Sequence, residues 1–284
     1  MADGEAILVL GATSLVGRFL IQRLEDEGAA AVALSRQARA PGRSVRWVEG
    51  DLADPTSLRG LGPASRVLSL PPIWLLTDAA LGALHELGMR RLVAFSSTSR
   101  FTKAASASVK ERAVALALAE GEARVEAFCR AHGVGFTLIR PTLIYAEGQD
   151  ANVSRLAVLI RRFGVLPLPG GGRGLRQPVH ADDLAALALT AMALPATDRA
   201  YEAPGGETLT YRAMVERIFD GLGRPRLILP VPLPLMRLAY ALARPWLGDA
   251  TAQMVDRVGE DLVFDPAAAV RDLGWAPRPF RPRF

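Results

Sequence analysis

The sequence predicts an α/β fold with a doubly wound parallel sheet and a small C-terminal lobe. In the first half of the chain, short continuous apolar runs alternate with segments of helical periodicity. A glycine-rich turn follows the first run, and from about residue 204 short elements are interrupted by prolines. Continuous apolar strands separated by helices are typical of parallel sheets covered on both faces. Right-handed crossovers then favour a doubly wound arrangement.

The apolar runs are the predicted strands of this sheet. They are Ala6–Leu10, Ala30–Leu34, Val45–Glu49, Val67–Leu70, Arg91–Phe95 and Phe136–Ile139. Helical periodicity predicts helices between them and beyond, at Leu15–Glu27, Leu75–Leu87, Ser106–His132, Ala151–Arg162 and Ala181–Met192. We expect residues 1–146 and 176–203 to form the sheet domain, and residues 147–175 and 204–284 to form a small lobe at its carboxyl edge.

Composition excludes several classes of protein. Of the 284 residues, 50% are hydrophobic and 22% charged, so the chain is not globally disordered. The net charge is +5, but the arginines are scattered and aromatic residues make up only 6%, so we expect no nucleic-acid partner. The single cysteine, Cys129, excludes internal disulfides and indicates a reducing compartment, the cytoplasm. No segment has the pattern of a secretory signal or of a membrane span. The histidines lack the spacing of metal ligands, so we expect no metal site.

The strongest motif is the turn that joins the first strand to the first helix. Gly11 permits a tight turn, and Gly17 lets the helix pack closely against the strand. The free amides at the start of the helix, at the positive end of its dipole, suit a pyrophosphate. The motif therefore predicts a dinucleotide site built from Gly11, Thr13, Ser14, Leu15, Val16 and Gly17. A glycine turn without a ligand is the alternative.

The second strand ends in Ser35 and Arg36 rather than in an acidic residue. An acid at this place binds the ribose 2′-hydroxyl of NAD, whereas an arginine accommodates the 2′-phosphate of NADP. The sequence thus favours NADP over NAD, with Arg39 and Arg43 as further phosphate contacts. The alternative is that Arg36 only ends a strand in solvent.

Motifs at the ends of later strands extend this pattern. They are Gly50-Asp51-Leu52, Ser96-Ser97-Thr98, the segment from Arg140 to Tyr145, and Val179-His180-Ala181-Asp182-Asp183. Together with the glycine turn they resemble the short-chain dehydrogenase/reductase superfamily, in its extended and atypical branch, the NAD-dependent epimerase/dehydratase family. The resemblance covers nearly the whole chain, and residues 261–277 resemble that group's substrate lobe.

The resemblance implies a Rossmann fold and a cofactor site that reaches beyond the glycine turn. It implies that Asp51 holds the adenine, and that residues from Pro141 to Leu143 line the nicotinamide side. The other cofactor contacts implied are Leu52, Leu70, Pro71 and Ser96. It also implies a homodimer, because the helix that matches Ser106–His132 often forms the dimer interface in this superfamily.

The catalytic pair of the superfamily is missing. Its chemistry usually runs through Tyr-x-x-x-Lys, where the lysine lowers the pKa of the tyrosine so that its phenolate can exchange a proton. Lys103 and Lys110 are the only lysines, and neither follows a tyrosine by four positions. Alignment of the long helix places Leu118 and Glu122 at the tyrosine and lysine positions.

Three functional readings follow from this absence. In the first, the chain is an oxidoreductase or epimerase-like enzyme that moves hydride on a small carbonyl or nucleotide-sugar substrate, with Ser97, Thr98 and Tyr145 polarising the carbonyl. In the second, it binds NADP(H) without turnover, as a sensor or assembly protein resembling the accessory subunit of respiratory complex I. In the third, it is an interaction module with no cofactor, which the glycine turn and Arg36 argue against.

Two further segments bear on the substrate. Arg176 matches an arginine that contacts the substrate diphosphate in nucleotide-sugar enzymes, and the alternative is a strand arginine paired with a carboxylate of the lobe. His180 is read as a packed core histidine rather than a base. The apolar segment 231–247 is read as a packing helix, with an apolar substrate tail, a quinone or peripheral membrane contact as the alternative.

Overall fold

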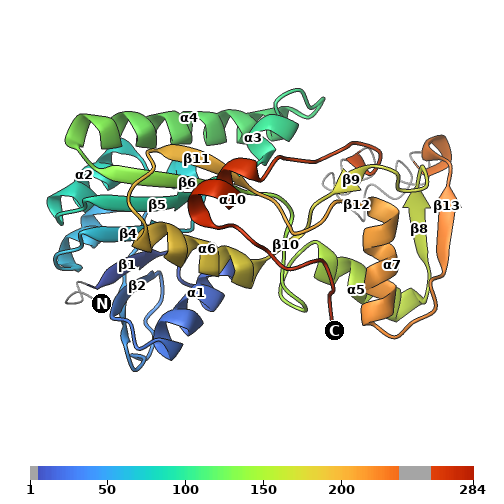
Figure 1. The fold of residues 1–284 in the computed structure, drawn as a ribbon, viewed down its shortest axis with the longest axis horizontal. Helices are drawn as coiled ribbons and strands as arrows, with labels where there is room; N and C mark the ends of the chain where they lie inside the picture. Colours follow the sequence, from blue (N-terminus) through green and yellow to red (C-terminus); the bar gives the residue numbers. More distant parts are fainter. Residues whose placement is uncertain (1–5, 237–256) are drawn as a thin grey trace. The chain divides into compact units, whose positions relative to one another are not determined.

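The computed structural model describes residues 6–236 and 257–284, which divide into two compact units (Figure 1). Unit 1 contains Met1–Pro141, Ala181–Ala203 and Pro266–Trp275, and unit 2 contains Thr142–His180, Pro204–Asp265 and Ala276–Phe284. The division differs from the predicted boundaries mainly at Pro266–Trp275. The helix in that segment, α10 (Ala267–Leu273), packs beside the edge strand of the unit 1 sheet, where the Tyr201 hydroxyl donates to Asp272 at 3.0 Å.

Unit 1 is built on a parallel sheet of seven strands in the order β11-β6-β5-β4-β1-β2-β3. The strands are β1 (Ile7–Leu10), β2 (Ala31–Ser35), β3 (Val45–Glu49), β4 (Arg66–Ser69), β5 (Arg91–Phe95), β6 (Gly135–Pro141) and β11 (Arg199–Ala203). The order reverses between β1 and β4, and ligands of doubly wound sheets bind at that switch point, outside the carboxyl ends of the strands. This topology confirms the predicted α/β class with a doubly wound parallel sheet.

The outermost strand, β11, was not among the predicted strands. It pairs with β6 on one side only, and of its five residues only Tyr201 and Ala203 are buried. Its sequence, Arg-Ala-Tyr-Glu-Ala, accordingly lacks the continuous apolar run that marks the inner strands. Because β11 lies at the edge of the sheet, its sequence lacks the apolar run by which the other strands were predicted.

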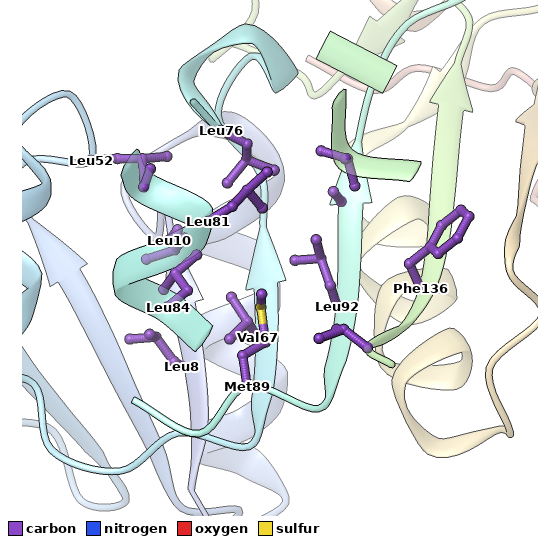
Figure 2. Close-up of a cluster of buried hydrophobic side chains, with 14 of the residues drawn as sticks. Leu8, Leu10, Leu52, Val67, Leu76, Leu81, Leu84, Met89, Leu92 and Phe136 are labelled. Carbon is purple, nitrogen blue, oxygen red and sulfur yellow. The ribbon is translucent and has the colours of Figure 1, made fainter. Parts of the chain in front are cut away.

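Helices cover both faces of the sheet. On one face, α2 (Asp78–Glu86) and α4 (Val109–His132) pack over the inner strands, and Figure 2 shows Leu81 and Leu84 of α2 beside Leu8 and Leu10 of β1. Because successive side chains of a strand point to opposite faces, the alternate residue Val9 lies outside this cluster. The other face carries α1 (Leu15–Asp26) and α6 (Ala181–Ala193), which pack against each other.

The long helix α4 begins three residues later than predicted. Ser108 is its N-cap, and its hydroxyl accepts a hydrogen bond from the Glu111 amide at 3.4 Å. Ser106, the predicted first residue, donates its hydroxyl to the Glu111 carboxylate at 2.6 Å and so belongs to the capping loop. Gly133 ends the helix with φ of 64°, a left-handed conformation that glycine adopts without strain.

Unit 2 has an apolar core between α5 (Val153–Phe163) and α7 (Tyr211–Gly221). Three short strand pairs complete it: β7 (Ile144–Tyr145) with β10 (Val179–His180), β9 (Leu175–Arg176) with β12 (Leu209–Thr210), and β8 (Leu166–Pro169) with β13 (Ile228–Val231). Of the apolar segment 231–247, only residues 231–236 lie within the described residues. None of the helices in the described part of the chain is long and apolar enough to cross a bilayer.

The first turn of α1 lies against the backbone at the end of β1. A Cβ at residue 17 would lie 2.4 Å from the carbonyl oxygen of Gly11 and 2.7 Å from the carbonyl carbon of Ala12. Both are main-chain atoms, which cannot rotate away as a side chain would. Glycine at position 17 is therefore required for this approach, as the sequence predicted.

We expect Gly17→Ala to destabilise the protein by about 1–3 kcal/mol, because overpacking against backbone forces the helix away from the strand. Urea unfolding without nucleotide measures this change. Gly82→Ala is the matched control, since Gly82 lies within α2 and a Cβ there has nothing within 4 Å. That variant is expected to gain about 0.5–1 kcal/mol from helix propensity. Equal effects of the two substitutions would contradict the close approach.

Candidate functional site

The start of α1 presents main-chain donors at the carboxyl end of β1. Ser14 is the N-cap, and its hydroxyl accepts the Gly17 amide at 3.1 Å. The amides of Leu15 and Val16 have no acceptor among the residues that the structure describes. Unbonded amides at the positive end of a helix dipole bind anions such as a pyrophosphate.

The predicted cofactor residues of β1 and β4 lie together. Gly11 has φ of 73°, and a Cβ there would lie 2.8 Å from the ring of Pro71. The Leu70 amide donates to the Leu10 carbonyl at 3.1 Å, which joins the ends of the two strands. Residue 11 must therefore be glycine, both for its positive φ and for the close approach of the Pro71 ring, whereas the unbonded amides of the α1 start are the groups that fit a pyrophosphate.

The end of β2 carries an exposed cation. The Arg36 side chain is exposed and forms no hydrogen bond or ion pair within the described residues. Arg39 lies over the ring of Trp47, 5.2 Å from its centroid. Asp51 follows β3, and its carboxylate accepts the amide of Ala53 at 3.0 Å, while Leu52 beside it is buried.

Three hydroxyl side chains follow β5, and they have different partners. Ser96 is buried and donates to Glu122 at 2.5 Å, and Thr98 is buried and donates to the Pro141 carbonyl at 3.1 Å. Ser97 is half-buried, and its oxygen accepts the Ser99 amide at 3.1 Å. The Ser97 hydroxyl hydrogen has no acceptor within the described residues, so Ser97 is the member of this set that can donate to a ligand.

A buried carboxylate, Glu122, stands at the predicted lysine position of α4. Its side chain is only 3% exposed. Arg140 binds it through two hydrogen bonds, of 3.0 Å from Nε and 2.6 Å from Nη2, and Arg100 binds it from α3 (Ser99–Thr102). Arg140 also reaches Glu202 on β11 at 3.0 Å. The lysine position therefore carries a negative charge that is already paired.

The pKa of Glu122 is set by two opposing effects. Burial by itself raises it, because a charged group loses hydration. Hydrogen bonds from Arg140 and Ser96, with the charges of Arg140 and Arg100, outweigh burial and hold the pKa below its usual value. Glu122 is therefore ionised at neutral pH and cannot act there as a general acid.

The predicted tyrosine position is part of the apolar core. Leu118 is 3% exposed and belongs to the cluster that α2 and α4 form over the sheet. Both aligned positions therefore have structural roles. Leu118 packs in the core, and Glu122 belongs to an ion network.

In unit 2, Tyr145 is buried at the end of β7. Its ring contacts His180 edge-on at 5.1 Å and Phe280 at 4.8 Å. His180 is also buried, with Nε2 at 3.1 Å from Glu147. Burial by itself raises the pKa of Glu147. Hydrogen bonds from His180 and from the Arg283 amide lower it by more than burial raises it, so the net pKa lies below its usual value.

Arg176, the predicted diphosphate ligand, is 5% exposed and bonded to main chain. Its Nη1 donates to the carbonyls of Leu175 at 2.8 Å and Glu260 at 2.5 Å, and its Nη2 donates to the carbonyl of Arg257. The partners are carbonyls rather than the carboxylate that the alternative reading expected. Burial lowers the pKa of Arg176.

A pocket of about 140 Å³ lies within unit 2, beside Arg176. Its wall consists of Leu143, Asn152, Val153, Leu156, Arg176, Tyr211, Met214, Arg257 and Leu262. Leu143, which the resemblance assigned to the cofactor, thus lines this pocket. The predicted catalytic set is divided between the units, with Ser97 and Thr98 in unit 1 and Tyr145 in unit 2.

Sequence reasoning missed two features of these sites. Arg100 and Arg140 are far apart in sequence, and only the fold brings them both to Glu122. Tyr211 carried no motif, yet it lines the unit 2 pocket with its ring 5.5 Å from the Arg176 guanidinium. The one signal in the sequence for the ion network was Glu122, an acidic residue at the position that the alignment matched to a lysine.

Removal of the Glu122 charge should destabilise unit 1 in a pH-dependent way. Glu122→Gln leaves the half-buried Arg100 without its carboxylate and Arg140 with Glu202 alone, and we expect a loss of about 3 kcal/mol at pH 7. A carboxylate with a lowered folded pKa stabilises above its unfolded pKa, about 4.3, and that contribution disappears as pH falls through the folded value. The loss should therefore shrink at pH 3 in urea unfolding.

Glu126→Gln on the same helix is the control for this measurement. Glu126 is exposed and pairs with Arg130 one turn away, so its loss should change the free energy of unfolding by less than about 0.5 kcal/mol. A Glu122→Gln effect that is as small, or that is the same at pH 3 and pH 7, would contradict the buried network.

Curated relatives with detectable sequence similarity include three of particular interest. UDP-glucose 4-epimerase of Vibrio cholerae is 28% identical over 165 residues, which are 57% of this chain and 48% of that protein. NADH dehydrogenase (ubiquinone) 1 alpha subcomplex subunit 9 of Arabidopsis thaliana is 26% identical over 86% of this chain and 63% of its own length. The chain therefore spans about half to two thirds of these two relatives.

The third relative matches over almost its full length. It is the (4-alkanoyl-5-oxo-2,5-dihydrofuran-3-yl)methyl phosphate reductase of Streptomyces griseus, 28% identical over 97% of this chain and 95% of that protein.

Solved structures share the fold at low sequence identity. UDP-N-acetylglucosamine 4-epimerase from Bacillus cereus superposes with a TM-score of 0.74 at 15% identity, covering 96% of this chain and 91% of that one. dTDP-glucose 4,6-dehydratase from Streptomyces venezuelae, solved with NAD bound, has a TM-score of 0.71 at 19% identity, covering 97% and 92%.

The family comparison agrees with the fold and with the glycine turn. The family model matches residues 7–67 and 74–203, which include six of the seven strands of the unit 1 sheet in full, the first half of β4, and the segment through Arg176 and His180. This span is well over half of the chain and confirms the resemblance drawn from the strand-end motifs. The chain belongs to the NAD dependent epimerase/dehydratase family.

Proposed function

We propose that unit 1 binds NADP(H) and that the chain is a reductase, which transfers hydride to a carbonyl substrate without the tyrosine and lysine of its superfamily. The observation that carries the proposal is the pair of unbonded amides of Leu15 and Val16 at the start of α1, just after the Gly11 turn. These donors suit a pyrophosphate. The relative that matches over nearly its full length is named a reductase, which supports the reaction class.

The choice of NADP over NAD rests on Arg36. Its guanidinium is exposed and unpaired within the described residues, and neither residue at the end of β2, Ser35 or Arg36, has a carboxylate to bind a ribose 2′-hydroxyl. A guanidinium binds a phosphate through two parallel hydrogen bonds. The 2′-phosphate of NADP is the group that would make use of it.

The chain's own hydroxyls set the rest of the chemistry. NADPH, when bound, supplies a hydride to the carbonyl carbon, and the carbonyl oxygen must gain a proton in the same reaction. Ser97 lies at the carboxyl end of β5, and its hydroxyl hydrogen has no acceptor within the described residues. Its hydroxyl therefore donates a hydrogen bond to the carbonyl oxygen and transfers its proton to that oxygen, and water then returns a proton to Ser97. Tyr145 and Thr98 remain the other predicted members of the set.

A second function, NADP(H) binding without turnover, has its own support. Leu118 is packed into the core, and Glu122 is ionised and paired, so neither position can relay a proton. The relative that covers 86% of this chain is named as a subunit of NADH dehydrogenase. In that case the chain would be a sensor or assembly protein. Homodimer formation through α4 and a cytoplasmic location stay predictions from the sequence.

The cofactor assignment is tested with Arg36→Ala. Loss of charge-assisted hydrogen bonds worth about 1.5–3 kcal/mol should weaken NADPH binding about 10- to 150-fold and NADH binding little. Titration calorimetry with both nucleotides measures this. Arg130→Ala is the control, because Arg130 lies in the last turn of α4 and pairs with Glu126. Equal losses for NADPH and NADH would remove the assignment.

Turnover is tested with Ser97→Ala against a panel of carbonyl and nucleotide-sugar substrates. A lost hydrogen-bond donor to the developing oxyanion should lower kcat about 100- to 1000-fold, with NADPH affinity unchanged. Ser99→Ala on α3 is the neighbouring control, and it should keep most of the activity. Wild-type protein that binds NADPH tightly but oxidises none of it over the panel would instead support the binding protein.

A further inference from the structure

The pocket of unit 2 has an aliphatic wall. Five of its lining residues are apolar: Leu143, Val153, Leu156, Met214 and Leu262. Two of them come from the first turns of α5 and the others from α7 and two connecting segments. A hydroxyl or phosphate against such a wall would lose hydration without regaining hydrogen bonds. The free-energy cost of that desolvation is at least as large as the net gain from an ordinary protein hydrogen bond. The wall therefore favours an apolar occupant.

Arg176, which lines this pocket, has its guanidinium occupied by main-chain groups of the protein. Three of the donors of Arg176 are held by the carbonyls of Leu175, Glu260 and Arg257, so the arginine supports the chain from Arg257 to Asp261. The Leu175 amide reinforces this by donating to the Asp261 carboxylate at 2.9 Å. Arg176 thus serves as a structural residue here rather than as an open clamp for a diphosphate.

Tyr211 is one of the polar residues that line the pocket beside its aliphatic wall, together with Asn152, Arg176 and Arg257. Its phenol has a pKa raised by burial, so it is a neutral donor at physiological pH. No hydrogen bond of its hydroxyl lies within the described residues. A carbonyl oxygen at the head of an apolar chain would satisfy this donor, whereas a saturated chain alone would not.

The volume limits the length of the occupant. A cavity of about 150 Å³ lined by aliphatic side chains accepts benzene, which has six carbons. The unit 2 pocket, at about 140 Å³, has nearly the same capacity. The reductase of Streptomyces griseus, which matches over 95% of its length, carries an alkanoyl group in the name of its substrate.

We propose that the unit 2 pocket binds an aliphatic chain of about six carbons on the substrate, with Tyr211 donating to a carbonyl oxygen at its head. The inference rests on the proposed reductase function, because it specifies which carbonyl compounds that enzyme takes. The substrate is thus an acyl compound or alkyl ketone rather than an unsubstituted nucleotide sugar.

The test is a series of 2-alkanones, from 2-butanone to 2-decanone, titrated into the full chain with and without NADPH. Affinity should rise about 4-fold for each added methylene, the equivalent of burying one CH₂ group, and level off near six chain carbons. Tyr211→Phe should weaken all members by about 2- to 10-fold while the chain-length dependence stays the same. A flat series, or one in which Tyr211→Phe has no effect, overturns the proposal.

Two tryptophan substitutions on neighbouring residues locate the binding. Leu262→Trp fills the pocket from its half-buried wall and should abolish the rise with chain length. Val263→Trp adds the same side chain at a position that is 42% exposed and outside the lining, and should leave the series unchanged. Asn152→Phe, from the exposed rim, serves as the second pocket variant if Leu262→Trp unfolds.

The outcomes separate this proposal from the proposed function. NADPH affinity, measured on the same samples, reports on unit 1 alone. Chain-length dependence that vanishes in the pocket variants supports the pocket, even where NADPH fails to bind and the reductase proposal falls. Normal NADPH binding with a series that Leu262→Trp leaves intact overturns the pocket and leaves the reductase proposal in place.

Discussion

The contact between the first turn of α1 and the backbone at the end of β1 is the constraint on which unit 1 depends. With no side chain at Gly17, the helix comes within contact distance of the Gly11 and Ala12 main chain. That approach brings the unbonded amides of Leu15 and Val16 to the carboxyl edge of the sheet. Parallel strands then carry the ends of β2, β3, β5 and β6 to the same edge. The strand ends where the sequence predicted the cofactor contacts therefore lie at one edge of the sheet.

The buried ion network at Glu122 distinguishes this chain from the usual chemistry of its superfamily. A lysine at that position would lower the pKa of a nearby tyrosine, whereas a carboxylate would raise it. The chain has neither the tyrosine nor the lysine, and Arg100 and Arg140 neutralise the carboxylate that remains. The network ties α3, α4 and β6 to β11 through Glu202. The position that the sequence alignment matched to the superfamily's lysine thus holds a structural cross-link.

Unit 2 shows a comparable change of role at Arg176. Its guanidinium holds main-chain carbonyls of the segment from Arg257 to Glu260, and the space beside it has aliphatic walls. The same residue type can clamp a diphosphate or brace a loop, and its hydrogen-bond partners decide which. Here the partners are internal. The rest of the pocket lining is mainly aliphatic, with Tyr211, Asn152 and Arg257 as its polar members, and this supports the proposed acyl substrate rather than a free nucleotide sugar.

The sequence by itself determined the fold class, six of the seven strands and the glycine turn, because buried parallel strands and helix starts leave local patterns of apolar residues and glycine. It also determined that Tyr-x-x-x-Lys is absent, since that needs only two residue positions. The edge strand β11, the partners of Glu122 and the pocket beside Tyr211 were decided by tertiary structure. Each depends on residues distant in sequence, such as Arg140 and Glu202, or Tyr211 and Leu262, which only the packing of strands and helices brings together.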